Sequence, residues 1–112
     1  MQIYHNPRCK TSREGLKYLE ERGYEIQVVN YMQDGISVDE LRTILKKSRL
    51  SVDDLIRKQE QLYKDEYKGK ELSQEEWLTI LSENPKLLQR PIVVNGSNAV
   101  LAQPPNEIDK IV

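Results

Sequence analysis

From residue 3 to residue 13 the chain reads IYHNPRCKTSR, and this stretch predicts a strand, a turn and a helix in succession. Gln2 to Tyr4 favours a short strand, and Asn6-Pro7 ends it because proline cannot donate a hydrogen bond to a neighbouring strand. A helix is expected from Lys10 to Arg22, with Gly23 at the position typical of a C-cap. Cys9 therefore falls at or beside the N-terminus of this helix.

The segments that flank the middle of the chain predict further strands. Glu25 to Tyr31 is rich in Ile, Val and Tyr and favours a second strand, so the opening third indicates a βαβ unit. Asn95-Gly96 is a strong hairpin-turn signal between the apolar stretches 92–94 and 99–101. A short helix is expected over 106–111, after Pro105.

The middle of the chain predicts helices. Ser37 and Ser73 are each followed three residues later by Glu, which is the capping-box pattern of a helix start. Ser51 begins a similar pattern, and we expect a helix from there that carries Arg57 and runs towards a polar break near Lys68. The order of elements predicts one α/β domain over residues 1–112, with a helical block at about 37–84.

Composition argues against several classes of protein and of binding site. The 112 residues include 17 basic and 18 acidic side chains, and a net charge of -1 offers no overall attraction to nucleic acid or to a membrane surface. No apolar stretch approaches the roughly 20 residues that span a bilayer, and the first residues lack a secretory signal, so a cytoplasmic location is expected. With a single cysteine, neither an internal disulfide nor a Cys-rich metal site is expected. Any redox role must therefore use an external thiol.

Cys9 is the leading candidate for a reactive side chain. A thiol at a helix N-terminus meets free backbone N–H groups and the positive end of the helix dipole, which favour the nucleophilic thiolate. His5, Arg8 and Arg13 are near enough in sequence to assist. The alternative is a structural cysteine that packs as a small apolar side chain.

The same helix N-terminus can bind an oxyanion through its N–H groups, with the hydroxyls of Thr11 and Ser12 as further donors. Ordinary capping of a surface helix is the alternative for these two residues. Arg57 and Arg90 could clamp a tetrahedral anion, or could be solvated surface charges. His5 could tune the thiol, or could stabilise the turn at Asn6.

The residues around Cys9 resemble those of the glutaredoxin-dependent arsenate reductase family, a thioredoxin-fold group with a helical insertion. The likeness covers residues 3–13, 56–60, 83–93 and 102–105, at the expected spacing. The resemblance implies a thioredoxin/glutaredoxin-like sheet of four strands, formed by a βαβ and a ββα unit. It also implies that Cys9 attacks arsenate, that the adduct passes to glutathione as co-substrate, and that glutaredoxin resolves the mixed disulfide. No bound cofactor or metal is expected.

The resemblance also assigns site residues. It implies that Arg57 and Arg90 contact the oxyanion, that His5 influences the thiolate and that Pro91 is a cis proline; Asn6 and Arg13 are expected to support the site. One position departs from the family: Gln103 stands where a third anion-binding arginine is expected. Glutamine lacks the charge for bidentate pairing, so weaker arsenate binding or a different thiol substrate is expected.

Two other functions remain open on sequence alone. The related Spx-type transcriptional regulators bind RNA polymerase, but they typically carry a Cys-x-x-Cys switch, and this chain has Cys9-Lys10-Thr11-Ser12 without a second sulfur. The other alternative is a glutathione-dependent thiol reductase that does not act on arsenate.

Overall fold

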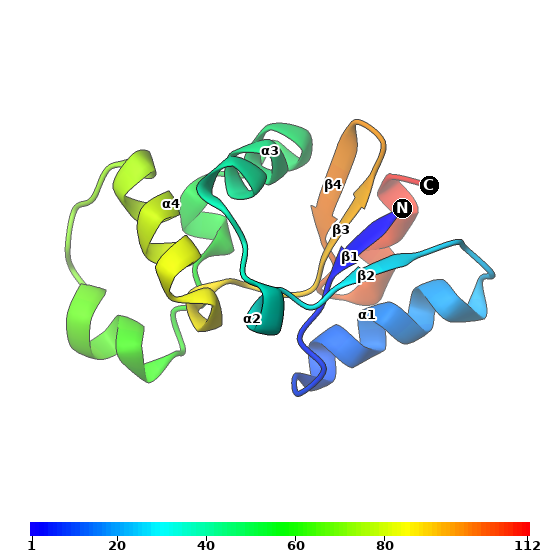
Figure 1. The fold of residues 1–112 in the computed structure, drawn as a ribbon, viewed down its shortest axis with the longest axis horizontal. Coiled ribbons are helices and arrows are strands. Elements are labelled where there is room, and N and C mark those ends of the chain that lie inside the picture. Colours follow the sequence, from blue (N-terminus) through cyan, green and yellow to red (C-terminus); the bar gives the residue numbers. More distant parts are fainter.

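The four strands form one mixed sheet in the computed structural model, which describes residues 1–112. They are β1 (Gln2–Tyr4), β2 (Gln27–Val29), β3 (Ile92–Asn95) and β4 (Asn98–Leu101), in the spatial order β2-β1-β3-β4. β1 and β2 are parallel, whereas β3 runs antiparallel to both β1 and β4. The predicted βαβ and ββα units are therefore both present, in a thioredoxin-like arrangement (Figure 1).

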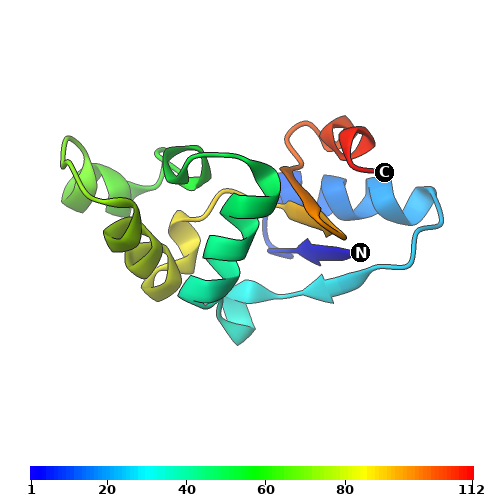
Figure 2. The same cartoon turned by 90° about the horizontal axis from the view of Figure 1, so that it is seen from above.

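Helices pack against both faces of this sheet. α1 (Lys10–Glu21) and the 3₁₀ helix η4 (Pro105–Lys110) lie together on one side, and α3 (Val38–Ser48) and α4 (Gln74–Glu83) form a block on the other (Figures 1 and 2). Because successive side chains of a strand point to opposite faces, Ile3 and Tyr4 belong to different cores. Ile3 packs with α1 and η4, whereas Tyr4 packs with the helical block.

Short helical segments join the larger elements. They are α2 (Tyr31–Asp34), the 3₁₀ helix η1 (Val52–Leu55), the π-helical turn η2 (Tyr63–Tyr67) and the 3₁₀ helix η3 (Pro85–Leu87). α3 and α4 begin where the sequence predicts, because Ser37 and Ser73 both form complete capping boxes. No helix is long and apolar enough to cross a bilayer.

The helix predicted from Ser51 towards Lys68 is interrupted: its first turn forms as η1 and residues 61–67 are again helical, but the prediction is wrong for the stretch around Arg57. After η1 the backbone becomes extended, and Ile56 forms an isolated antiparallel bridge with Leu88. The N–H of Arg57 donates to the carbonyl oxygen of Leu87 at 2.7 Å. Pairing with a distant segment thus overrides the local helical pattern, and Arg57 lies outside any helix.

The second strand and the hairpin differ in detail from the predictions. β2 is shorter than the expected range of 25–31, because the side chain of Asn30 accepts a hydrogen bond from the N–H of Gln33 at 3.3 Å and so caps α2. Tyr31 consequently begins a helix. In the hairpin, Asn95 still pairs with Asn98, so the loop residues are Gly96 and Ser97 rather than Asn95 and Gly96.

Candidate active site

The sheet topology gathers the candidate residues at one edge. Tyr4, the last residue of β1, pairs with Val29 at the end of β2 and with Ile92 at the start of β3. Ile92 in turn pairs with Leu101, the last residue of β4. The segments that leave this edge therefore contain four residues of interest. These are Cys9 after β1, Tyr31 after β2, Arg90 before β3 and Gln103 after β4.

Cys9 is the N-cap residue of α1, as the sequence predicts. Its backbone is extended, with φ of -98° and ψ of 124°, and its side chain makes no capping hydrogen bond. The first turn of α1 contains no acidic residue that could neutralise the helix dipole. The partly exposed sulfur thus sits at an open, positively polarised helix end.

The surroundings of Cys9 favour its thiolate. Burial by itself would raise the pKa of the thiol, but the backbone N–H groups of Ser12 and Thr11 and the guanidinium of Arg90 outweigh it and lower the pKa below its usual value. A structural cysteine in apolar packing would show the opposite shift. The position therefore has the electrostatics of a nucleophile.

Ser12 joins His5 to the turn before Cys9. The Ser12 hydroxyl is fully buried, lies 2.7 Å from Nδ1 of His5 and accepts a hydrogen bond from the N–H of Asn6 at 2.9 Å. The hydroxyl thus faces inward, and Ser12 acts on the thiolate through its backbone N–H. Burial lowers the pKa of His5, and the charge of Arg13 acts in the same direction, so the imidazole is neutral near pH 7.

The turn between β1 and α1 is fixed by further hydrogen bonds. The side chain of Asn6 accepts from the N–H of Arg8 at 3.1 Å, and the carbonyl oxygen of Asn6 accepts from the N–H of Cys9 at 3.0 Å. Arg13 donates from Nη1 to the carbonyl oxygen of Pro7 at 3.0 Å. Asn6 and Arg13 therefore support the site by holding the turn.

Arg90 is a buried cation, with only 6% of its surface exposed. Its Nη1 donates to the carbonyl oxygens of Lys86 at 3.1 Å and Leu88 at 3.2 Å, which fix the guanidinium in place. The peptide bond between Arg90 and Pro91 is cis, as the resemblance implies.

Gly15 allows α1 to approach Pro91 closely. A Cβ atom added at Gly15 would lie only 2.6 Å from Cγ of Pro91, well inside van der Waals contact. Because α1 carries Cys9 and Pro91 adjoins Arg90, this contact fixes the two functional groups relative to each other.

Arg57 is less buried than Arg90 and already has an anionic neighbour. Its Nη1 lies 2.5 Å from Oε1 of Glu60, and the two side chains are 26% and 23% exposed. The charge of Arg57 also acts on the hydroxyl of Tyr31, as do the charges of Arg90 and Cys9. Arg57 therefore borders the same region, with its charge partly balanced by Glu60.

The side chain of Gln103 is hydrogen-bonded to the backbone of the segment that contains Arg90. Its side-chain amide donates to the carbonyl oxygen of Arg90, and the N–H of Ala102 donates to the carbonyl oxygen of Pro91 at 2.9 Å. The residue at the position where the resemblance implies an arginine is thus engaged with backbone and adds no charge to the site.

Two residues of this region were not identified from the sequence. Gly15 and Tyr31 matter through contacts with distant segments, and the only sequence signal was a glycine inside a helical pattern, which often marks close packing. No group of three or more His, Cys, Asp and Glu side chains is placed to hold a metal ion.

The chain is similar to known proteins over nearly its whole length. The ArsC family model matches residues 4–111. An arsenate reductase of Haemophilus influenzae is 41% identical over 97% of this chain and 96% of its own length, and one of Neisseria meningitidis is 34% identical over 99% and 97%. The solved structure of an arsenate reductase from Vibrio cholerae superposes with a TM-score of 0.94 at 38% identity, covering 100% of this chain and 98% of that one. The chain belongs to the ArsC family.

Proposed function

We propose that this protein reduces arsenate to arsenite, with Cys9 as the nucleophile. The observation that carries the proposal is the position of the Cys9 thiol at the uncapped N-terminus of α1, where the N–H groups of Ser12 and Thr11 and the guanidinium of Arg90 lower its pKa despite burial. A thiolate beside a fixed guanidinium can attack an oxyanion whose negative charge the same cation neutralises. Family membership supports arsenate as that oxyanion.

The chemistry proceeds in three steps. The Cys9 thiolate forms a bond to arsenic, and one arsenate oxygen, once protonated, leaves as water. The thiolate of glutathione then attacks the sulfur of Cys9; the sulfur–arsenic bond breaks, arsenic keeps the electron pair and leaves as arsenite, and a Cys9–glutathione disulfide remains. A thiol of glutaredoxin takes the glutathione from this disulfide and returns Cys9 to its thiol form.

An external thiol is required because the chain has one cysteine. Beside the turn that leads to Cys9 lies a surface hollow of about 520 Å³, with the exposed Arg8 on its wall. Such a cation suits the carboxylates of glutathione. The hollow is lined by Asn6, Pro7, Arg8, Asn30, Met32 and Gln33.

Coupled turnover of arsenate with glutathione and glutaredoxin tests this proposal. The parent protein should turn over, and Cys9→Ser should lose at least about 1,000-fold in rate because serine is not ionised near neutral pH. Without glutaredoxin, the parent should stop after one turnover and carry the added mass of one glutathione on Cys9. Equal rates for the parent and Cys9→Ser would refute the enzymatic proposal.

Reduction of glutathione mixed disulfides is a second candidate function. The hydrogen bond of the uncharged Gln103 side chain to the backbone favours it. Since Gln103 supplies no charge and bonds to the carbonyl oxygen of Arg90, the site has fewer cations for a multiply charged oxyanion than the family resemblance implies. A glutathionylated peptide supplied instead of arsenate distinguishes the two. Rapid Cys9-dependent cleavage of that peptide, without arsenate turnover, would select the second candidate.

A further inference from the structure

Three buried side-chain atoms have no hydrogen-bond partner in the protein, and two of them belong to the Cys9 edge of the sheet. The three are Oη of Tyr31, Nε of Arg90 and Oε1 of Gln89. Nearly all buried polar groups in proteins are hydrogen-bonded, so each exception calls for a physical reason. Tyr31 Oη and Arg90 Nε can both act as donors. Together they indicate a site at which a bound molecule would supply the missing acceptor.

The backbone fixes Tyr31 at this place. Tyr31 directly follows β2 and is fully buried, and Asn30 caps the helical turn that it begins. The N–H of His5 donates to the carbonyl oxygen of Val29 at 2.9 Å, which ties the start of the Cys9 turn to the residue before Asn30. Tyr31 and Cys9 therefore leave the sheet side by side, from neighbouring parallel strands.

The Tyr31 hydroxyl has charged neighbours but no protein acceptor. Burial raises its pKa to about 12, the adjacent Arg90 side chain and the charge of Arg57 lower the pKa only in part, and the charge of Cys9 raises it, so the hydroxyl keeps its proton at physiological pH. The groups that stabilise the Cys9 thiolate are Ser12, Thr11 and Arg90, and Tyr31 is not one of them. The hydroxyl proton therefore has no acceptor within the protein.

We propose that the Tyr31 hydroxyl is a substrate-binding group that donates a hydrogen bond to an oxygen of the oxyanion held at Cys9, beside Nε of Arg90. This inference rests on the proposed function, since it assigns a further ligand to the same anion. A tetrahedral oxyanion offers several acceptor oxygens, so one oxygen can meet Tyr31 while another meets Arg90. A neutral donor in this position also makes up in part for the charge that Gln103 does not supply.

Tyr31→Phe tests the assignment because it removes the hydroxyl and keeps the ring that packs in the core. The readout is the concentration of arsenate that protects Cys9 from alkylation by iodoacetamide, which reports binding without requiring turnover. Protection of Tyr31→Phe should need about tenfold more arsenate than protection of the parent, the usual effect of one lost hydrogen bond to a charged group. Tyr67→Phe, a partly buried tyrosine that packs on Trp77, is the matched control and should behave as the parent.

Two accompanying measurements separate binding from structure. The alkylation rate of Cys9 without arsenate should keep the same pH midpoint in Tyr31→Phe, because the hydroxyl does not stabilise the thiolate. The urea midpoint should be unchanged or higher, since the variant removes a buried hydroxyl that has no partner. A lower urea midpoint would mean that the hydroxyl has a partner within the protein and would overturn the inference.

The outcomes also separate this inference from the proposed function. Equal protection of the parent and Tyr31→Phe by arsenate would refute the role of Tyr31 and leave arsenate binding at Cys9 intact. Absence of protection in the parent would refute arsenate as the substrate, and the assignment of Tyr31 would fall with it.

Discussion

The N-terminus of α1 differs from the N-termini of α3 and α4 in how its free N–H groups are satisfied. At α3 the hydroxyl of Ser37 accepts from the N–H of Glu40 at 3.0 Å, and the Glu40 carboxylate returns the contact. Ser73 forms the same capping box with Glu76 at α4. At α1 the N-cap residue is Cys9, and no side chain closes the helix end.

The three helix N-termini also differ in the charged residues of their first turns. The first turns of α3 and α4 contain the carboxylates that compensate a helix dipole, whereas the first turn of α1 contains none. A carboxylate at α1 would raise the pKa of Cys9 and repel an anion. Two helix ends are thus closed by capping boxes, and the third is left open beside the Cys9 thiol.

Among the changes at these helix ends, loss of the Arg90 charge should have the largest effect on activity. Arg90→Gln removes the cation beside the sulfur, so we expect the specificity constant for arsenate to fall about 100-fold or more. The pH midpoint of Cys9 alkylation should move up towards that of an ordinary thiol. Coupled turnover and iodoacetamide kinetics measure the two effects.

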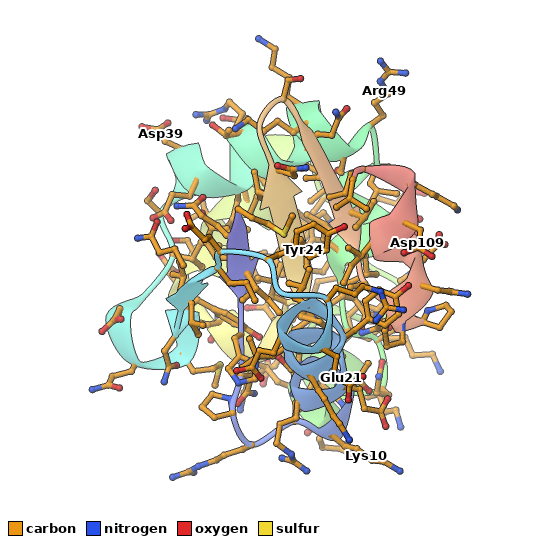
Figure 3. The ribbon with its side chains drawn as sticks, turned by 90° about the vertical axis from the view of Figure 1, so that its right-hand side faces the viewer. Lys10, Glu21, Tyr24, Asp39, Arg49 and Asp109 are labelled. Atoms are coloured by element: carbon orange, nitrogen blue, oxygen red, sulfur yellow. The ribbon has the colours of Figure 1, made fainter.

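Arg49→Gln is the control for that change. Arg49 is exposed at the C-cap of α3, on the opposite side of the molecule from Lys10 at the start of α1 (Figure 3). It should match the parent in both assays. If Arg90→Gln matched the parent as well, Arg90 would have no part in the site.

Gly15→Ala should have the next largest effect, through packing. The added Cβ collides with Pro91, and α1 must shift relative to the segment that carries Arg90. We expect the free energy of unfolding in urea to fall by about 1–3 kcal/mol, the usual range for overpacking. Lys17→Ala, on the exposed face of the same helix, should leave stability within about 0.5 kcal/mol. Equal stability of Gly15→Ala and the parent would show that the two segments do not need this close contact.

The smallest predicted effect concerns the caps themselves. Ser73→Ala should lower the free energy of unfolding by about 1 kcal/mol between about pH 6 and pH 9, because it removes the capping hydrogen bond of α4.

Cys9→Ala loses no such bond, so its effect on the free energy of unfolding should depend on pH instead. The pKa of Cys9 is lowered in the folded state, so the thiolate's contribution to stability is fully present above the ordinary thiol pKa and is lost as pH falls through the folded value.

Urea titrations of Cys9→Ala and the parent across this pH range check that sign. The pH-dependent part of the difference should grow as the pH rises and disappear in acid. A difference that stayed constant with pH would mean that the helix end does not stabilise the thiolate.

Local sequence signals predicted much of the fold. The starts of α3 and α4 follow from serine and glutamate three residues apart, and the position of Cys9 follows from a strand, a proline turn and a helix within a dozen residues. Interactions of this range are complete within the segment itself, so they can be seen without knowing the rest of the chain.

The errors have the opposite origin. The segment around Arg57 favours a helix by its own residues, but the pairing of Ile56 with Leu88 makes that backbone extended. The composition of residues 25–31 favours a strand through Tyr31, whereas β2 ends at Val29 and the hydroxyl of Tyr31 lies at the Cys9 edge. The extended backbone at Arg57 has no local signal; Asn30 is a local cap that starts α2, but nothing in that segment shows that the Tyr31 hydroxyl meets the Cys9 edge.

The sequence by itself determined that one thiol would lie at the open end of a helix and would need an external thiol for any redox cycle. Only the tertiary structure decided which groups meet that thiol: Arg90 beside the sulfur, Tyr31 with a free hydroxyl, and Gln103 bound to backbone. The physical reason is the separation along the chain of the residues that interact. Capping depends on neighbours three residues away, whereas a binding site at a sheet edge depends on how distant strands pair.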